Sequence, residues 1–208
     1  MHSWRCYLLY FFAIVMATNA ASRDKVKRQP VKTNEKKPVT PWEFISSKTI
    51  YMLKSNTSIP LVQCIRANTV TRNETEQTLT HIVLVKVTIQ DKWISMNATY
   101  NPLKRAPNGT ATKFTSVDGT TQETTNYTFS FFNRCCAVVE KTKGKPPKDF
   151  RGSCELWVND IYFREVARRA RSVCQNEFQS YCGPRAGVSY EGKECNLPEL
   201  RYAPRMDE

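Results

Sequence analysis

Short stretches of alternating apolar and polar residues, separated by turn residues, fill the chain between Trp42 and Val158. Such alternation places successive side chains on opposite faces of a strand. It predicts strands over residues 49–54, 61–67, 82–89, 95–101, 111–117, 124–132, 135–141 and 153–158. The polar run 73–80 and Asn101-Pro102 are among the predicted turns. Eight strands at this spacing are typical of a β-sandwich or an up-and-down barrel.

The period changes after residue 158 and predicts one C-terminal helix. Its expected packed face consists of apolar residues at helical spacing: Val166, Ala170, Val173, Cys174 and Phe178. Asn159 or Asp160 is the expected N-cap, and Cys182-Gly183-Pro184 is expected to end the helix. The arginines at 164, 168, 169 and 171 occupy other faces and are interpreted as a solvated basic surface. The architecture is therefore mainly β, closed by one helix.

The first 21 residues predict an export signal rather than a structural element. Arg5 precedes an apolar run, Tyr7–Ala17, which is about half of the ~20 residues that span a bilayer. Small residues follow, as at a signal-peptide cleavage site. No second apolar run exists, so the product is expected to be soluble, secreted and extracellular, with no membrane span.

Three further segments follow from composition. Residues 22–40 are rich in Lys and Arg and predict a flexible basic tail. A glycosaminoglycan or anionic-surface contact is the alternative for this tail. Residues 41–200 are expected to form the folded domain, and residues 201–208 a C-terminal tail.

Composition argues against an enzyme. The net charge is +12, but only two histidines exist, His2 and His81, which leaves little for a metal cage or a Ser/His/Asp site. Neither GxGxxG nor a GxxxxGK[ST] motif is present, so no sequence motif indicates nucleotide binding. No cofactor, no metal and no nucleic-acid partner is expected.

Export changes how the cysteines and asparagines are interpreted. Seven cysteines remain after the signal, and in an oxidising compartment they predict three disulfides and one spare thiol. Spacing alone leaves their pairing open. Five N-x-[ST] triplets predict surface glycosylation, at Asn56, Asn73, Asn97, Asn108 and Asn126.

The segment Cys154-Glu155-Leu156-Trp157-Val158, followed by Cys174, Phe178, Cys182 and Cys195, resembles the tick salivary lipocalins of the histamine-binding protein family. The resemblance implies an eight-stranded antiparallel barrel with the helix packed on its outside. It also implies the disulfides Cys64–Cys195 and Cys154–Cys182, and a third from Cys135 or Cys136 to Cys174. If position 137 faces inward, alternation turns Cys135 inward too, so Cys136 becomes the outward partner and Cys135 the spare thiol.

Strand alternation places Glu155 and Trp157 on one face, which would be the barrel interior if Leu156 and Val158 pack on the helix. A buried carboxylate needs a cation or hydrogen bonds, so the candidates for its partner are a ligand ammonium lying against Trp157 or an interior Arg, Lys or Tyr. Tyr127, Phe129 and Phe131 alternate in the same way and form one candidate aromatic wall. Tyr51 and Trp93 are weaker wall candidates.

The amine-binding members of the family carry Cys-Asp-aliphatic, then Glu-Leu-Trp/Tyr, then Cys. Here the first part is Cys136-Ala137-Val138, so the aspartate is missing. Glu140 cannot replace it, because a residue three positions farther along a strand points to the opposite face. A lost charge-assisted contact costs about 1.5–3 kcal/mol, which puts high-affinity histamine binding in question.

The resemblance implies a small-molecule-binding protein that lowers the free concentration of histamine or serotonin and so suppresses inflammation or haemostasis at the bite. One alternative is a leukotriene or another fatty-acid-like mediator, for which Lys86 is the candidate cavity cation. The other is a host protein, such as a complement component, bound on the outer surface. A monomer is expected, and Cys135 offers a disulfide-linked dimer.

Overall fold

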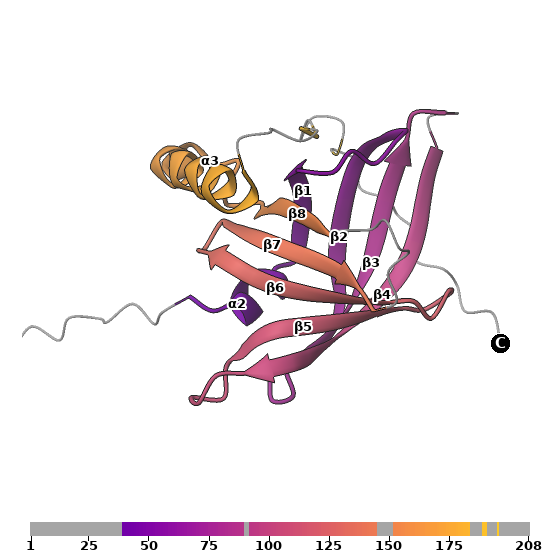
Figure 1. Cartoon of the computed structure of the whole chain (residues 1–208), viewed down its shortest axis with the longest axis vertical. Coiled ribbons are helices and arrows are strands. Elements are labelled where there is room, and N and C mark those ends of the chain that lie inside the picture. The colour runs from indigo at the N-terminus through magenta and orange to yellow at the C-terminus, as the bar shows by residue number, and fades with distance from the viewer. Residues whose placement is uncertain (1–38, 90–91, 145–151, 184–188, 191–194, 196–208) are drawn as a thin grey trace, which may run out of the picture. The chain divides into compact units, whose positions relative to one another are not determined.

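The computed structural model describes residues 39–89, 92–144, 152–183, 189–190 and 195. Eight antiparallel strands form a closed barrel in chain order, with β8 paired to β1 (Figure 1). The strands are β1 (Thr49–Ser55), β2 (Val62–Asn73), β3 (Thr78–Val87), β4 (Lys92–Arg105), β5 (Ala111–Asp118), β6 (Thr124–Phe132), β7 (Cys136–Lys143) and β8 (Ser153–Asn159). The predicted fold class is confirmed, and the choice between sandwich and barrel is decided.

The predicted signal peptide, most of the basic tail and the C-terminal tail lie outside the described residues. Among the residues that are described, no helix has the length and apolar character needed to cross a membrane.

One predicted turn is confirmed and one is wrong. The polar run 73–80 turns at residues 74–77, between the end of β2 at Asn73 and the start of β3 at Thr78. The expected break at Asn101-Pro102 is wrong, since β4 runs through Pro102 to Arg105. The register shifts directly after Pro102, and a bulge is where a strand tolerates the missing N–H of proline.

A short helix, α2 (Pro41–Ile45), closes one end of the barrel and was not predicted. Thr40 and Glu43 form a reciprocal capping box, and Pro41 occupies the first turn. The helix buries Trp42, Phe44 and Ile45. Five residues are too few to show a helical period, although the Thr-Pro-x-Glu sequence is itself a helix-start signal.

The C-terminal helix, α3 (Arg168–Cys182), follows a 3₁₀ turn, η2 (Glu165–Ala167), and packs on the outer face of β7 and β8. The predicted N-cap is wrong: Asn159 ends β8 and its Oδ1 accepts from the N–H of Ile161, while α3 has no side-chain cap. The helix therefore starts later than predicted. The residues that it buries are Cys174 and Phe178.

The rest of that predicted face is only partly packed. Ala170 is half-buried against the same cluster, but Val166 is 89% exposed and Val173 is 41% exposed. Val166 lies in the 3₁₀ turn before the helix. Val173 directly precedes the buried Cys174, so it lies on a different side of the helix.

The disulfides are the three that the resemblance implies: Cys64–Cys195, Cys136–Cys174 and Cys154–Cys182. Cys135 is a free, buried thiol, also as expected. Its expected inward direction is wrong. Cys135 lies in the bend before β7, where alternation does not apply, and its Sγ is 3.8 Å from that of Cys174 on the helix side.

A segment near the C-terminus completes the barrel wall. Among the described residues, β1 pairs with β2 only over Thr49–Tyr51. Farther along β1, Lys54 pairs with Ser189, and the N–H of Tyr190 donates to Leu53 O. Tyr190 is buried in the interior cluster, and the Cys64–Cys195 bridge ties Cys195 to β2.

Candidate functional site

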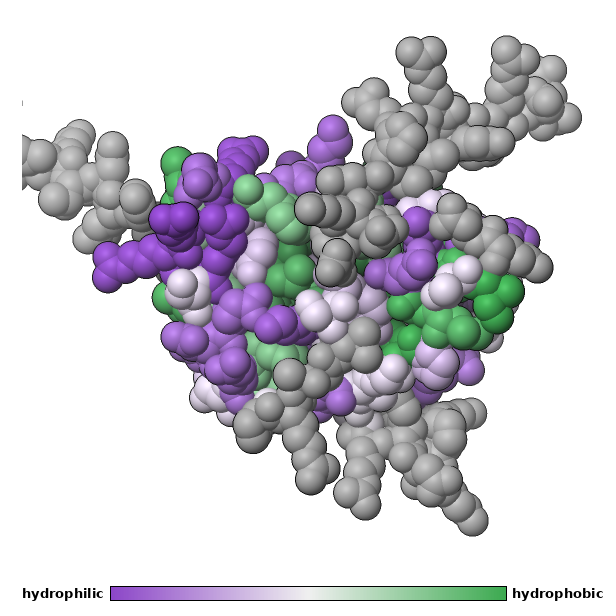
Figure 2. All heavy atoms as spheres, turned by 90° about the horizontal axis from the view of Figure 1, so that it is seen from above, coloured by the Kyte–Doolittle hydropathy of each residue, from purple (hydrophilic) through white to green (hydrophobic). Residues whose placement is uncertain are grey.

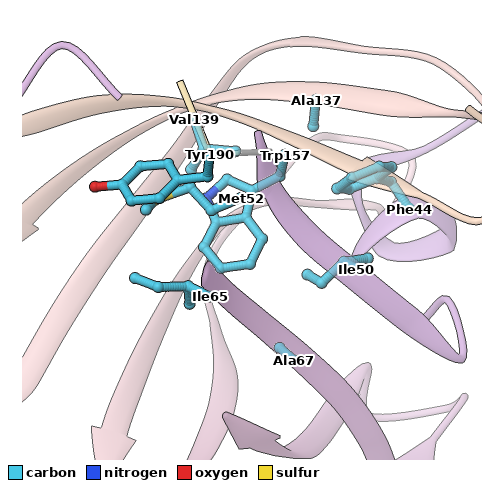
Figure 3. Close-up of a cluster of buried hydrophobic side chains, with 9 residues drawn as sticks. All are labelled: Phe44, Ile50, Met52, Ile65, Ala67, Ala137, Val139, Trp157 and Tyr190. Carbon is cyan, nitrogen blue, oxygen red and sulfur yellow. The ribbon is translucent and has the colours of Figure 1, made fainter. Parts of the chain in front are cut away.

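Beside a second apolar cluster around Phe114, the barrel interior contains an apolar cluster around Trp157, into which a polar group is set. Its buried members come from α2, four strands and the C-terminal segment: Phe44, Ile50, Met52, Ile65, Ala67, Ala137, Val139, Trp157 and Tyr190 (Figure 3). Alternation along β7 then turns Lys141 inward after Ala137 and Val139, and along β8 it turns Glu155 inward beside Trp157. This confirms the predicted interior placement of Glu155 and Trp157.

Glu155 is the polar centre of this interior, with only 1% of its side chain exposed. Its Oε1 accepts a hydrogen bond from Ser153 Oγ at 3.0 Å and lies 3.2 Å from Lys141 Nζ. Its Oε2 accepts from Trp157 Nε1 at 2.7 Å. The carboxylate is therefore fully partnered, as a buried charge must be. Of the partners that the sequence allowed for this carboxylate, a ligand ammonium or an interior Arg, Lys or Tyr, the structure shows a lysine, Lys141.

Lys141 places an ammonium between this carboxylate and an aromatic ring. Its Nζ lies 5.6 Å from the ring centroid of Tyr127, within cation–π range. Burial by itself lowers the pKa of Lys141, but the Glu155 charge and Tyr127 outweigh burial, so the pKa is raised above its usual value. The lysine side chain is 23% exposed, so part of it is in reach of solvent.

A narrow cavity lies beside this group, toward the end that α2 closes. It is lined by aromatic and aliphatic side chains: Phe44, Ile45, Ile50, Tyr100, Tyr127, Phe129, Val139 and Trp157. The cavity volume is about 20 Å³, which is room for roughly one water molecule. Tyr127 and Phe129 thus face inward as predicted, and side chains leave little free space in this cavity.

Phe131 is the exception in the predicted aromatic wall. The β6–β7 register shifts between Phe129 and Phe131, which inserts Ser130 as an extra residue. Phe131 therefore packs against the cluster under α3, outside the barrel, and Phe132 turns inward in its place. The bulge breaks the period of two on which the prediction rested.

Three other predicted positions lie on the outer face. Lys86 is cross-strand from Cys64, whose side chain points outward to Cys195, and from Trp93. Cross-strand partners share a face, so neither Lys86 nor Trp93 points into the cavity. Tyr51 is outside as well, where its hydroxyl donates to Asp160 Oδ1 at 3.1 Å.

The sequence model of one protein family, described as tick histamine binding protein, matches residues 32–196. The chain belongs to this family. The barrel also resembles solved structures, among them a biogenic amine-binding protein, solved as its selenomethionine derivative, with a TM-score of 0.50 and 8% identity over 75% of this chain and 88% of that one. An identity this low shows the shared fold alone.

Two further structures are similar. One is the AM182 serotonin complex, with a TM-score of 0.48 and 18% identity over 77% of this chain and 95% of that one. The other is the tryptamine complex of the amine binding protein of Rhodnius prolixus, with a TM-score of 0.49 and 6% identity over 76% and 89%. No curated protein sequence matches the chain.

As a member of the tick histamine binding protein family, the chain departs from the amine-binding pattern at Ala137. Ala137 is fully buried in the interior and lies cross-strand from Trp157. Glu140 does not replace the missing acid: it is exposed, and it accepts from Ser130 Oγ on the outside. Glu155 is therefore the one carboxylate within the described part of the interior cluster around Trp157.

Sequence reasoning missed two interior groups in this family member. Counting by two from Ala137 along β7 gives Lys141, so alternation predicts that Lys141 faces inward but does not predict that it meets Glu155. The second group is His81, which is fully buried beside Tyr100; its Nε2 lies 3.1 Å from Ile45 O and donates to that carbonyl. No sequence signal pairs His81 with α2, because β1, β2 and their connecting segments separate them in the chain.

The five predicted glycosylation sites lie at the surface. Asn56, Asn73, Asn97 and Asn108 are exposed, and Asn126 is half-exposed on the outward side of β6. Figure 2 shows apolar areas between hydrophilic ones on the face seen from above.

Proposed function

We propose that the protein is a secreted, glycosylated, stoichiometric binder of a small biogenic amine, histamine or serotonin, that holds the ligand ammonium on Glu155 inside the barrel. One observation carries this proposal: the interior already accommodates a primary ammonium, that of Lys141, between the Glu155 carboxylate and the Tyr127 ring. The family match agrees with it. By lowering the free amine concentration, the protein would suppress inflammation or haemostasis at a tick bite.

The chemistry of the site suits an aryl-ethylamine. Ser153 and Trp157 hold the carboxylate in one orientation, so a ligand ammonium meets a fixed acceptor. A charge-assisted hydrogen bond of this kind contributes about 1.5–3 kcal/mol. The aromatic lining, including Tyr100 and Phe129, would contact the ligand ring.

Glu155→Gln should weaken amine binding by about 10- to 150-fold, because the amide keeps the shape but loses the charge. The measurement is a calorimetric titration of the secreted protein with histamine and with serotonin. Glu140→Gln, which removes an exposed carboxylate on the outer face of β7, is the matched control and should titrate like the unaltered protein. Equal affinity of the Glu155→Gln variant would refute the site.

Lys141 also favours a second candidate, a fatty-acid-like mediator such as a leukotriene. Its ammonium lies over Tyr127, which lines the apolar cavity, and would pair with a ligand carboxylate. Ala137 stands in place of an acid whose charge would repel one. The small size of this cavity favours the remaining candidate, a host protein bound on the outer surface. A protein that takes up neither amine nor fatty acid in titration would leave only that candidate.

A further inference from the structure

Lys141 occupies the place that the proposed ligand needs. Its Nζ is 3.2 Å from Glu155 Oε1 and 5.6 Å from the Tyr127 centroid, so its contacts are those expected of a ligand ammonium. The four-carbon stem fills space beside Tyr127, whose ring also lines a cavity with room for roughly one water molecule. No amine can contact Oε1 and the ring together while Lys141 remains there.

We infer that Lys141 is a tethered internal competitor whose ammonium must leave Glu155 before an amine ligand enters, and that it thereby sets the affinity and the smallest ligand accepted. This inference rests on the proposed function. The group is intramolecular, so its effective concentration at Glu155 far exceeds that of any dissolved amine. Only a ligand with contacts beyond its ammonium, such as an aromatic ring in the apolar cavity, displaces it.

The position of Lys141 makes this exchange feasible. Its side chain is 23% exposed, whereas that of Glu155 is 1% exposed, so the lysine can move its ammonium to water while the carboxylate cannot. Lysine stems commonly lie along apolar surface with the charged end solvated. The charge inside the barrel is unchanged by the exchange, because one ammonium replaces another. The carboxylate keeps its bonds from Ser153 and Trp157 throughout.

The test compares the histamine and tryptamine affinities of three variants by calorimetry. Lys141→Met keeps the stem length and removes the charge, and it should bind both amines at least about tenfold more tightly. Lys141→Arg should bind them more weakly than the unaltered protein, because a guanidinium can make two hydrogen bonds to a carboxylate. Lys143→Met is the control: this exposed lysine on the same strand pairs with Glu123 and should change neither affinity.

The outcomes separate the inference from the proposed function. If the unaltered protein binds amines and Lys141→Met binds them equally or more weakly, the competitor is refuted and the amine function stands. If only Lys141→Met binds amines, the competitor is supported and the unaltered protein is not an amine binder. Loss of oleic acid binding in Lys141→Met, with no amine binding in any variant, would overturn both. Should Lys141→Met fail to fold, the Lys141→Arg variant decides. Weaker amine binding than in the unaltered protein supports the competitor, and equal or tighter binding refutes it.

Discussion

Replacing Cys64 and Cys195 with alanine should lower the free energy of unfolding by about 5 kcal/mol on the chain-entropy treatment of disulfides. The bridge spans a sequence separation of 131 residues, far more than the separation of 28 for Cys154–Cys182. It also anchors the segment that places Tyr190 in the barrel interior. Its loss therefore relaxes the unfolded chain and loosens the wall between β1 and β2.

Urea unfolding of the double variant measures this loss. The matched control is the Cys154→Ala/Cys182→Ala variant, which should lose about 3.5 kcal/mol by the same treatment, because its loop is shorter. The Cys64/Cys195 variant should in addition bind amines more weakly, because Tyr190 packs against Trp157. A smaller loss for the Cys64/Cys195 pair than for the control pair would contradict this account of the C-terminal segment.

The protein should lose roughly 3 kcal/mol of stability through His81 alone between pH 7 and pH 4. Burial lowers the pKa of His81 from 6.5 to about 4, although its hydrogen bond to Ile45 acts in the opposite direction. The unfolded chain therefore binds a proton at a higher pH than the folded protein does. The stability is fully present above about 6.5 and is lost as the pH falls toward 4.

The variant His81→Gln isolates this effect, since its amide can still donate to Ile45 O and does not titrate. Unfolding free energies at pH 7, 5.5 and 4 should fall more steeply for the unaltered protein than for the variant. Carboxylates titrate in both proteins and cancel in the comparison. Parallel pH profiles would show that His81 is charged, or solvated, in the folded state.

The barrel was predictable because its strands alternate, and the departures from prediction occur where alternation is broken locally. The bulge at Ser130 depends on how β6 meets β7, so no pattern within β6 reveals that Phe131 faces outward. Cys135 precedes its strand by one residue, and that offset alone reverses its expected direction. Both errors concern register, which pairing between strands fixes rather than either strand alone.

The candidate site was predictable in its acid but not in its partner. A carboxylate two residues before a tryptophan on a buried strand is visible in the sequence, and so is its need for a partner. Several lysines were available to satisfy it, and the sequence left open which interior Arg, Lys or Tyr would do so. Only the cross-strand register, which sets Val139 opposite Glu155, brings Lys141 to the carboxylate.

The account's central claim is that an amine binds with its ammonium at Glu155, and a crystal structure of the tryptamine complex tests it most directly. The predicted result is a ligand nitrogen about 3 Å from Glu155 Oε1 and over the Tyr127 ring, with Lys141 Nζ displaced toward solvent. Tryptamine bound elsewhere, with the Lys141–Glu155 pair intact, would contradict the claim.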